Sequence, residues 1–418
     1  MVSRNLRFKF TLVSYNILSQ TLLSDHGYLY TNCNPRDLEW PRRGHKIVSE
    51  LIHNQADIIC LQEVESEHLQ SLYRPRLAHY GYECLYKKKT GYKIDGCAIF
   101  YKIKLFNLLN YKGVEFNRTD LTYLLDRDNV GIIAVLQPRC NTRSKSSHLV
   151  IANTHLIFNP RRCDIKLAQL KFFLSQLEEI SFDCYDSDRN EKCHHPTILC
   201  GDMNSTPDSQ LSKYILKQQQ SNSNTVLPPV SASSDQGENL ETTPNNSGNN
   251  TSCSPSSDLV RELITDLTQL EVGQSQRLVT DDKSQQKIGQ ESSTTTVADE
   301  DSSDTKVLSD SLQSEQSCGS INVGSSNNCF NRSTTSFSHF DHSLHFKSVY
   351  PTHNGAGQKY ISTFSSDIVD YIFYTPNKLR LESYRELLTR EQLEDIGPLP
   401  NSDFPSDHLS LEAKFTLR

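Results

Sequence analysis

Apolar runs of strand length recur along this chain, and most of them stop at a residue with a carboxylate, amide or imidazole side chain. Eight runs are rich in β-branched and aromatic residues, which is the composition of buried strands. The predicted strands are Phe10–Asn16, Asp57–Gln62, Gly96–Tyr101, Gly131–Gln137, Leu149–Thr154, Thr197–Gly201, Val369–Tyr374 and Leu409–Phe415.

Helical periodicity appears between several of these strands. The segment Arg43–Gln55 places Ile47, Leu51 and Ile52 on one face, and Asp164–Ile180 shows the same spacing of apolar residues. Strands that alternate with amphipathic helices predict an α/β fold in which helices pack on a sheet in layers.

A long polar segment interrupts this pattern between residues 217 and 340. Ser, Asn, Thr, Gln and Asp dominate the segment, and aromatic residues are nearly absent from it. Because so few apolar side chains cannot offset the entropy cost of ordering, the segment is predicted to be a disordered insertion. We therefore expect one domain in two parts, residues 1–216 and 341–418. Within the insertion, Asp258–Leu270 has helical spacing, which fits either a partner-docking helix or a helix that docks back on its own domain.

The negative charge is concentrated in the same segment. The whole chain carries −7, but the stretch from Lys217 to His339 alone holds 16 acidic and 7 basic residues. The remaining residues are therefore close to neutral and slightly basic. The negative net charge of the whole chain does not argue against a nucleic-acid partner, because a modest basic patch suffices to bind the end of a short nucleic-acid strand.

The twelve cysteines are spread out and lack the spacing of zinc or redox motifs. Several of them, such as Cys60, Cys97 and Cys200, fall inside apolar runs, which predicts buried reduced thiols rather than disulfides. No apolar signal segment begins the sequence, and no window reaches the length of a membrane span. These features predict a cytoplasmic or nuclear protein without a membrane partner.

Two polar residues at strand ends are candidate ligands for a hard cation. Glu63 follows the apolar run Asp57–Gln62, and Asn16 ends the first strand. Functional groups of open α/β sheets gather at the carboxyl ends of strands. Mg²⁺ takes oxygen ligands and often only one or two of them from protein. Taken alone, a residue such as Glu63 is more often an ordinary surface carboxylate at a strand end.

Asp202 and Asn204 stand two residues apart after another apolar run. In extended backbone both side chains point to the same side. The carboxylate can activate an attacking water while the amide donates to a phosphate oxygen. The alternative is a simple turn, because Asp and Asn before Ser-Thr-Pro are favoured there without any catalysis.

Two histidines, His155 and His408, each follow a polar residue at a strand boundary. Imidazoles can stabilise the additional charge of a five-coordinate phosphorus, and Asp370 is a candidate to fix the tautomer of one of them. A single histidine in such a place is more often structural. Two histidines together with three acidic groups favour a hydrolytic metal site.

These residues lie in motifs that resemble the endonuclease/exonuclease/phosphatase superfamily of Mg²⁺-dependent phosphodiesterases, in particular its carbon catabolite repressor deadenylase group and the Angel branch of that group. The resemblance spans nearly all of the chain outside the insertion. Its motifs are Ser14–Gln20, Leu61–Val64, Asp95–Ile99, Leu125–Gly131, Asn153–Leu156, Asn159–Arg162, Cys200–Ser205, Val369–Tyr374 and Ser406–Leu409.

The resemblance implies a four-layer sandwich, with two sheets face to face and helices outside. It also implies Mg²⁺, or Mn²⁺ in its place, as cofactor. By the same resemblance, Glu63 and Asn16 would be metal ligands, with Asp407 supporting them. Asp202 would activate water, and Asn204 would bind the phosphate. His155 and His408 would stabilise the transition state, with Asp370 orienting His408, and the nucleotide side would be lined by Asn129, Pro160 and Arg161.

The sequence departs from the related deadenylases in two places. A basic run, Lys87–Lys93, precedes Asp95-Gly96-Cys97-Ala98, where those deadenylases carry a longer and partly acidic segment. This difference indicates another way of binding the end of the RNA strand. The long insertion precedes the last site-bearing strands and either gates access or is simply tolerated. The leucine-rich repeats of some deadenylases are absent.

We expect a phosphodiesterase that processes RNA 3′ ends, with two variants. One removes a 2′,3′-cyclic phosphate, and the other is a stepwise 3′-to-5′ exoribonuclease; the same metal and water chemistry serves both. Two alternatives remain: an RNA-binding or translation-linked scaffold with weak catalysis that recruits protein partners through the insertion, and a small-molecule phosphodiesterase of the same fold.

Overall fold

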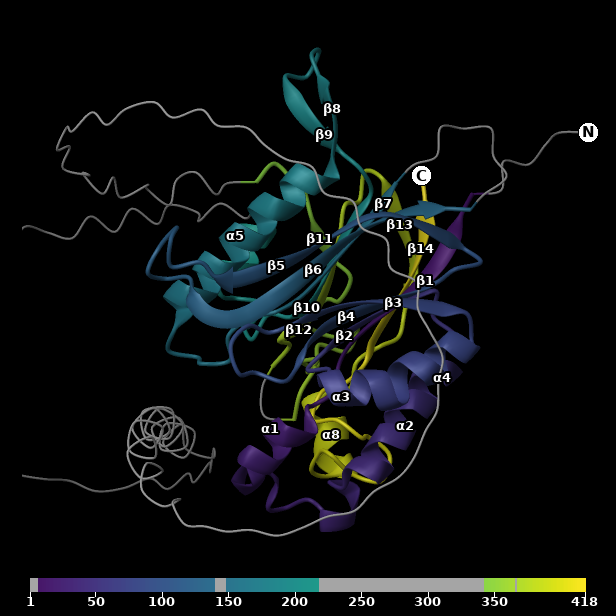
Figure 1. Cartoon of the computed structure of the whole chain (residues 1–418), viewed down its shortest axis with the longest axis vertical. Helices are drawn as coiled ribbons and strands as arrows, with labels where there is room; N and C mark the ends of the chain where they lie inside the picture. The colour runs from purple at the N-terminus through teal and green to yellow at the C-terminus, as the bar shows by residue number, and fades with distance from the viewer. Residues whose placement is uncertain (1–6, 140–147, 218–341, 365–366) are drawn as a thin grey trace, which may run out of the picture. The chain divides into compact units, whose positions relative to one another are not determined.

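The computed structural model describes residues 7–139, 148–217, 342–364 and 367–418. The predicted insertion, apart from Lys217 at its start, and the predicted helix within it lie outside these residues. The described residues form two six-stranded sheets and a separate two-stranded hairpin. Figure 1 shows the two sheets stacked face to face, with helices on their outer sides. This is the four-layer α/β sandwich that the resemblance implies.

The first sheet has the order β13-β14-β1-β2-β4-β3. Its strands are β1 (Lys9–Asn16), β2 (Ile58–Gln62), β3 (Tyr82–Lys88), β4 (Gly96–Lys102), β13 (Leu379–Tyr384) and β14 (Leu411–Leu417). Strands β1 and β2 run parallel, with Asn16 opposite Gln62, and the other pairs are antiparallel. The parallel pair therefore brings Asn16 and Glu63, the residue after β2, to the same edge.

The second sheet has the order β11-β12-β10-β7-β6-β5. Its strands are β5 (Phe106–Asn117), β6 (Asp126–Pro138), β7 (Leu149–His155), β10 (Thr197–Asp202), β11 (Lys347–Ser348) and β12 (Asp370–Tyr374). Strands β7 and β10 are parallel, and β12 runs antiparallel to β10. Strands β11 and β12 follow the insertion in the sequence. Strand β12 pairs with β10, and β11 pairs with β12.

Side chains of the first sheet alternate between two cores. In β2, Ile58 and Cys60 face the second sheet, whereas Ile59 and Leu61 face the helices. A strand that is buried on both faces has a continuous apolar sequence, because neither face is in contact with water. One polar pair lies between the sheets: Gln62 Nε2 donates to Asn153 Oδ1 over 2.7 Å, and Asn153 Nδ2 donates to the carbonyls of Leu61 and Ala98. These bonds fix the strand ends of one sheet against the other.

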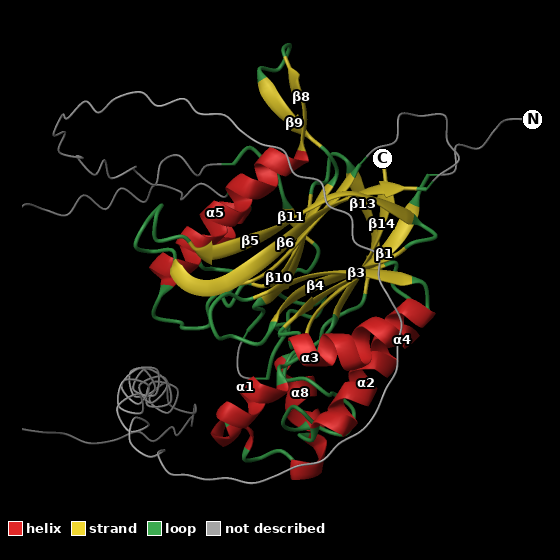
Figure 2. Ribbon diagram, viewed as in Figure 1, coloured by secondary structure: helices red, strands yellow, loops and turns green. Residues whose placement is uncertain are grey.

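The two predicted helices are confirmed, each with slightly different ends. Helix α2 (Trp40–His53) packs its apolar face on the first sheet, and α5 (Cys163–Ser181) covers the second (Figure 2). The other helical segments are short: α1 (Gln20–Asp25), α3 (Ser66–His68), α4 (Arg74–His79), α6 (Gln210–Ile215), α8 (Arg390–Ile396), and the single turns Gly27–Tyr30, Pro35–Asp37 and Leu69–Tyr73. Within the described residues, no helix is both long and apolar enough to cross a membrane.

Several strands were missed by the sequence pattern. Strands β5 and β13 expose most of their side chains, so neither forms an apolar run. The hairpin of β8 (Phe182–Asp186) and β9 (Glu191–His194) projects beyond the end of α5 and is almost wholly exposed (Figure 1). The predicted buried thiols Cys60, Cys97 and Cys200 are confirmed as buried and free, but Cys163 and Cys184 are free and exposed.

Candidate active site

Strand register places three polar residues side by side at one edge of the second sheet. Asp202 ends β10, opposite His155 of β7 on one side and Asp370 of β12 on the other. The preceding Gly201 has a φ of +136°, and a Cβ there would lie 1.9 Å from the Thr154 carbonyl oxygen. Only glycine fits this conformation and this close approach, so Gly201 sets the backbone that presents Asp202.

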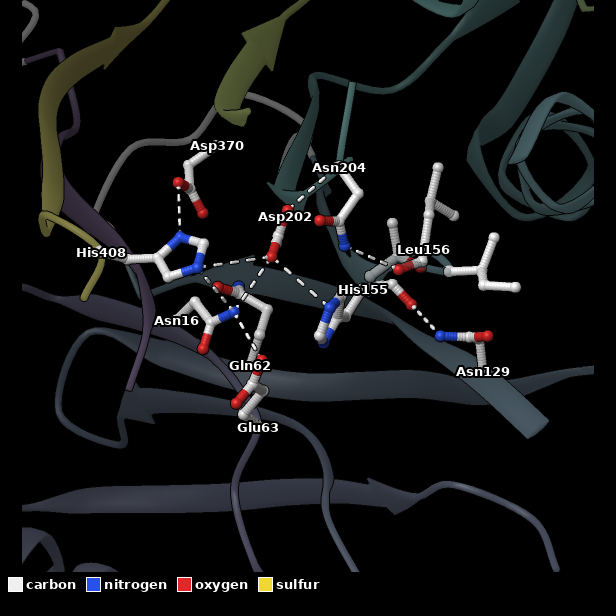
Figure 3. Close-up of polar contacts among 12 residues, drawn as sticks. Asn16, Gln62, Glu63, Asn129, His155, Leu156, Asp202, Asn204, Asp370 and His408 are labelled. Carbon is white, nitrogen blue, oxygen red and sulfur yellow. Dashed lines mark hydrogen bonds and ion pairs between the residues drawn. The ribbon is translucent and has the colours of Figure 1, made fainter. Parts of the chain in front are cut away.

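Asn16 connects this edge to the first sheet. Its Nδ2 donates to Glu63 Oε1 and to Asp202 Oδ2, each over 3.0 Å, and lies 3.4 Å from His408 Nε2. His155 Nε2 lies 3.4 Å from the same Asp202 oxygen. Figure 3 shows the side chains of Asn16, His155 and His408 directed towards Asp202. Five strands or loops that are distant in the sequence thus meet at one buried cluster.

His408 is held by a chain of hydrogen bonds. Its Nδ1 donates to Asp370 Oδ2 over 2.8 Å, and the Ser362 hydroxyl donates to that same oxygen over 2.6 Å. Ser362 Oγ in turn accepts the backbone N–H groups of Val369 and Asp370. With Nδ1 occupied by a carboxylate, the Nε2 side of the ring faces Asn16 and Asp202. Asp370 therefore fixes both the tautomer and the direction of this imidazole.

The two candidate metal ligands of the first sheet differ in what they present. Glu63 adopts a left-handed φ of +60°, and its second carboxylate oxygen accepts the backbone N–H of Ser19. The Asn16 oxygen, which was expected to face a metal, accepts the backbone N–H of Leu18 over 3.1 Å. The Asn16 nitrogen is the atom that lies between the carboxylates. The role of Asn16 as a metal ligand stays a prediction.

Burial and mutual charge separate the protonation states of the three central groups. Burial, and then the charge of Asp370, raise the pKa of Asp202 to about 7. Burial alone would lower the pKa of His408, but the charge and hydrogen bond of Asp370 outweigh it and raise that pKa well above its ordinary value. Burial, followed by the neighbouring Lys89 and His408, lowers the pKa of His155. Near neutral pH the site thus holds one cationic imidazole, one neutral imidazole and a carboxylate close to half-protonation.

This geometry coincides with a family match that covers most of the chain. The model of the Endonuclease/Exonuclease/phosphatase family matches residues 13–408. The chain belongs to this family. It is similar to protein angel homolog 2 of Mus musculus, with 34% identity over 98% of this chain and 70% of the relative. It is also similar to protein angel homolog 1 of Homo sapiens, with 42% identity over 50% of this chain and 31% of the relative.

Solved structures of the family agree with the fold. A crystal structure of ANGEL2, described as a 2′,3′-cyclic phosphatase in complex with adenosine-2′,3′-vanadate, superposes with a TM-score of 0.64 and 31% identity, covering 98% of this chain and 96% of that one. The human Nocturnin catalytic domain has a TM-score of 0.53 at 19% identity, covering 100% of this chain and 98% of that one, which supports the fold alone. As a member of this family, the protein is a hydrolase acting on phosphate ester bonds.

Divalent metal dependence is characteristic of the family, and the donor set of this site fits a hard cation. Within the described residues, Asp202, Asp370 and His408 bring oxygen and nitrogen atoms within 4.8 Å of one another. The carboxylates are the donors in this group, because His408 is protonated. The buried oxygens Asp370 Oδ1 and Asp407 Oδ1 have no hydrogen-bond partner there. Burial raises the pKa of Glu63, and nearby Asp95 and Asp407 add to this effect. Such a concentration of buried carboxylates favours an oxygen-binding cation, which would offset their charge.

The other predicted residues lie at different distances from the centre. The backbone N–H of Asn204 donates to Asp202 Oδ1, and its Nδ2 donates to the carbonyl of Leu156. Asn129 Nδ2 donates to the carbonyl of His155. The Asn129 side chain thus supports His155, and the Asn204 backbone supports Asp202. Each side-chain amide uses one of its two hydrogens in the bond given above.

Three predicted residues are not part of the central hydrogen-bonded cluster. Asp407 Oδ2 accepts the hydroxyl of Tyr30 over 3.0 Å. Pro160 and Arg161 are exposed on the loop between β7 and α5, and among the described residues neither has a side-chain hydrogen bond to the cluster. The basic run is largely engaged: Lys87 pairs with Glu115, and Lys89 pairs with the buried Asp95 over 2.7 Å.

Sequence reasoning missed several residues that hold the site together. Arg43 is fully buried and donates to the carbonyls of Ile17, Leu18 and Pro405. Ser406 Oγ donates to the Asn16 carbonyl over 2.7 Å. Arg43 had no local signal, because its backbone partners Ile17, Leu18 and Pro405 are distant in the sequence. Ser362 belongs to no recognised motif, and its partners Val369 and Asp370 lie seven and eight residues further along the chain. Ser406 had a usable signal, since it directly precedes Asp407-His408.

Proposed function

We propose that the protein removes 2′,3′-cyclic phosphates from RNA 3′ ends in a divalent-metal-dependent hydrolysis. The observation that carries this proposal is the meeting of Asn16, Glu63, His155, Asp202 and His408 at one buried cluster. The substrate class is supported by the solved relative with 31% identity, a 2′,3′-cyclic phosphatase in complex with adenosine-2′,3′-vanadate.

Asp202 is the proposed general base. A group with a pKa of about 7 accepts a proton from water with little energetic mismatch at neutral pH. Asn16 Nδ2 and the Asn204 backbone N–H hold its two oxygens, so the carboxylate keeps a fixed direction. The base takes one proton as the water oxygen attacks phosphorus, and one ring P–O bond breaks. A second water completes the removal of phosphate in the same way.

The imidazoles stabilise charge on the phosphoryl oxygens. His408 is cationic, and its Nε2–H side faces the centre because Asp370 holds Nδ1. It therefore donates a charge-assisted hydrogen bond to a non-bridging oxygen, or a proton to the departing ribose oxygen. His155 is neutral and adds a second donor without adding positive charge that would repel a metal.

The residues proposed to hold the cation are Glu63 and Asp407, with Asn16 beside them. Mg²⁺ suits this oxygen-rich set, and Mn²⁺ is expected to replace it. When bound, such an ion polarises a phosphoryl oxygen and offsets negative charge. Glu63 supplies one carboxylate whose other contacts, to Asn16 and Ser19, keep it in place.

The second candidate is stepwise 3′-to-5′ exoribonuclease activity. It uses the same attack on phosphorus and differs only in the bond that breaks. A tail-degrading enzyme must also hold nucleotides upstream of the reacting phosphate. Asn129, Pro160 and Arg161 are the residues proposed to line that nucleotide side, and Arg161 is exposed and available for it.

One gel distinguishes the two activities. Purified full-length protein is incubated with an RNA that ends in a 2′,3′-cyclic phosphate and, separately, with an RNA that ends in a 3′-hydroxyl adenosine tail, each with Mg²⁺ or with EDTA. We expect loss of the cyclic phosphate without shortening, and no reaction in EDTA. A ladder of shortened products from the adenosine tail would instead establish the exonuclease. Inertness on both substrates would favour the scaffold hypothesis.

Variants test whether the observed activity belongs to this site. Glu63→Gln is expected to lower kcat by at least about 10²-fold, because it removes a buried charge where the cation is proposed to bind. Glu67→Gln is the matched control, since Glu67 is exposed four residues later. Equal activity of the Glu63 variant and the wild type would remove Glu63 from the mechanism.

A further inference from the structure

The hairpin β8–β9 carries two cysteines in opposite strands. Cys184 of β8 is the direct register partner of Cys193 of β9, followed by the pairs Tyr185–Lys192 and Asp186–Glu191. The register shifts by one residue between Phe182 and Cys184, which makes Asp183 the extra residue of a bulge. The pairing of the two cysteines is thus set by the hairpin itself and not by a distant contact.

The spacing of this pair suits a covalent bond. Opposed residues in antiparallel strands have Cα atoms about 4.5 or 5.5 Å apart. Disulfides require about 4.4–6.8 Å between their Cα atoms, so either type of pair lies within that range. Both cysteines are free in this structure. Cys184 is exposed and Cys193 is half-buried, so an oxidant can reach them from solvent.

We propose that Cys184 and Cys193 form a reversible cross-strand disulfide when the protein meets a peroxide or a small disulfide. With hydrogen peroxide, the thiolate of one cysteine attacks a peroxide oxygen, which gives a sulfenic acid and releases water. The second thiol then attacks that sulfur, an S–S bond forms, and a second water leaves. Two thiols are oxidised by two electrons in total, and one peroxide is reduced to two waters.

The bond would fix a hairpin that anchors the second part of the domain. Lys192 and His194 lie on β9, next to Cys193. Lys192 pairs with Glu178 over 2.9 Å, and Glu178 accepts both the backbone N–H and the hydroxyl of Ser343. His194 Nε2 lies 2.7 Å from the same hydroxyl. Ser343 is the second described residue after the insertion, so the disulfide would restrain the contacts that hold this end of the chain.

A tryptic digest tests the proposal directly. Arg189 is exposed in the hairpin loop, between the two cysteines, so cleavage there separates them into different peptides. Full-length protein is treated with hydrogen peroxide, alkylated, digested without reductant and examined by mass spectrometry. We expect a linked peptide pair, two hydrogen atoms lighter than the sum of the two peptides, which disappears on addition of dithiothreitol.

Variants separate a specific pair from general thiol oxidation. Cys163→Ser should keep the linked peptides, because Cys163 is an exposed thiol outside the hairpin. Cys184→Ser should leave Cys193 open to alkylation at every peroxide concentration that yields the link in the wild type. The proposal is overturned if both cysteines remain alkylatable while Cys163 is oxidised, or if Cys184 links to a different cysteine.

Discussion

Asp202 holds a carboxylate at the point where the two sheets meet, without the water that would stabilise its charge. Asn16 and the Asn204 backbone donate to it, but Asp370 lies beside it in register and repels it. A carboxylate in such a place destabilises the folded protein in exchange for reactivity. Stability and catalysis should therefore move in opposite directions when this charge is removed.

Asp202→Asn is expected to abolish most activity while stabilising the metal-free protein. The folded-state pKa of Asp202 is about 7, against 3.8 for the unfolded chain, so the folded state binds the extra proton between these values. The free energy of unfolding therefore falls as pH rises through this window, because the unfolded chain gives up the proton of Asp202 more readily than the folded protein does. The Tm advantage of the variant should grow from pH 5 to pH 7 and level off above it, reaching several °C, since one pKa unit corresponds to about 1.4 kcal/mol. Thermal denaturation in EDTA measures it. A variant that is less stable than the wild type at pH 8 would contradict the assigned pKa.

Asp370→Asn is expected to change the pH profile as well as the rate. Without the Asp370 charge, the pKa of His408 falls, and the cationic imidazole loses its proton at lower pH. The alkaline limb of kcat should therefore shift to lower pH, and kcat should fall by about 10²-fold or more. Asp367→Asn is the control, since the Asp367 carboxylate forms ion pairs with Lys359 and Arg390. A reduced kcat with an unshifted profile would show that Asp370 acts in some other way than by raising the pKa of His408.

At the scale of elements, the site depends on a clamp between the end of β1 and the loop before β14. Arg43 of α2 donates to the carbonyls of Ile17 and Leu18 on one side and of Pro405 on the other. Ser406 Oγ then donates to the Asn16 carbonyl, and the backbone N–H of His408 donates to Ser406 Oγ. The buried guanidinium thus fixes the segment that carries Asn16 against the segment that carries His408.

Arg43→Met is expected to lower both stability and kcat. Loss of the guanidinium leaves several buried carbonyls without a donor, which costs about 3–5 kcal/mol in comparable buried sites. KM should change less than kcat, because the two displaced segments carry reacting groups. Arg42→Met provides the comparison, since Arg42 is exposed and forms an ion pair with Asp37. Unchanged kcat in a stable Arg43 variant would mean that the loop holds its position without the clamp.

The sequence pattern was sufficient for strands that are buried on both faces and for the two amphipathic helices, and insufficient for the more exposed strands. Strand β2 forms a continuous apolar run, so its end and Glu63 could be placed in advance. Strand β13 is half exposed and alternates apolar with polar residues, so its strand state depends on pairing with β14. The amide direction of Asn16 could not be predicted, because its nitrogen donates to Glu63 and Asp202, which approach it only in the folded protein. The support from Ser362 could not be predicted either, because the bond from its hydroxyl to Asp370 depends on the fold of the loop between them.

At the scale of the whole molecule, the two described ends that flank residues 218–341 lie close together. Tyr214 of α6 contacts the ring of His342, with centroids 5.2 Å apart. Ser343 is held by Glu178 of α5 and His194 of β9. From there the chain continues to β11 and β12, which add to the second sheet beside β10. The domain therefore closes across the insertion through contacts of its own residues.

Replacing residues 218–341 by a short Gly/Ser linker should leave the active site intact. The linker needs only to join ends that the Tyr214–His342 contact already brings together. Each halving of a flexible loop recovers about 0.6 kcal/mol of closure entropy, so the shortened protein should be as stable as the full chain or somewhat more stable. Melting temperature and kcat on the preferred RNA, each with Mg²⁺, are the measurements.

Unchanged kcat means that the insertion is tolerated by the domain, and a rise in kcat with unchanged Tm would identify it as a gate. A large loss of Tm would show that the insertion belongs to the fold, contrary to the two-part domain predicted from the sequence.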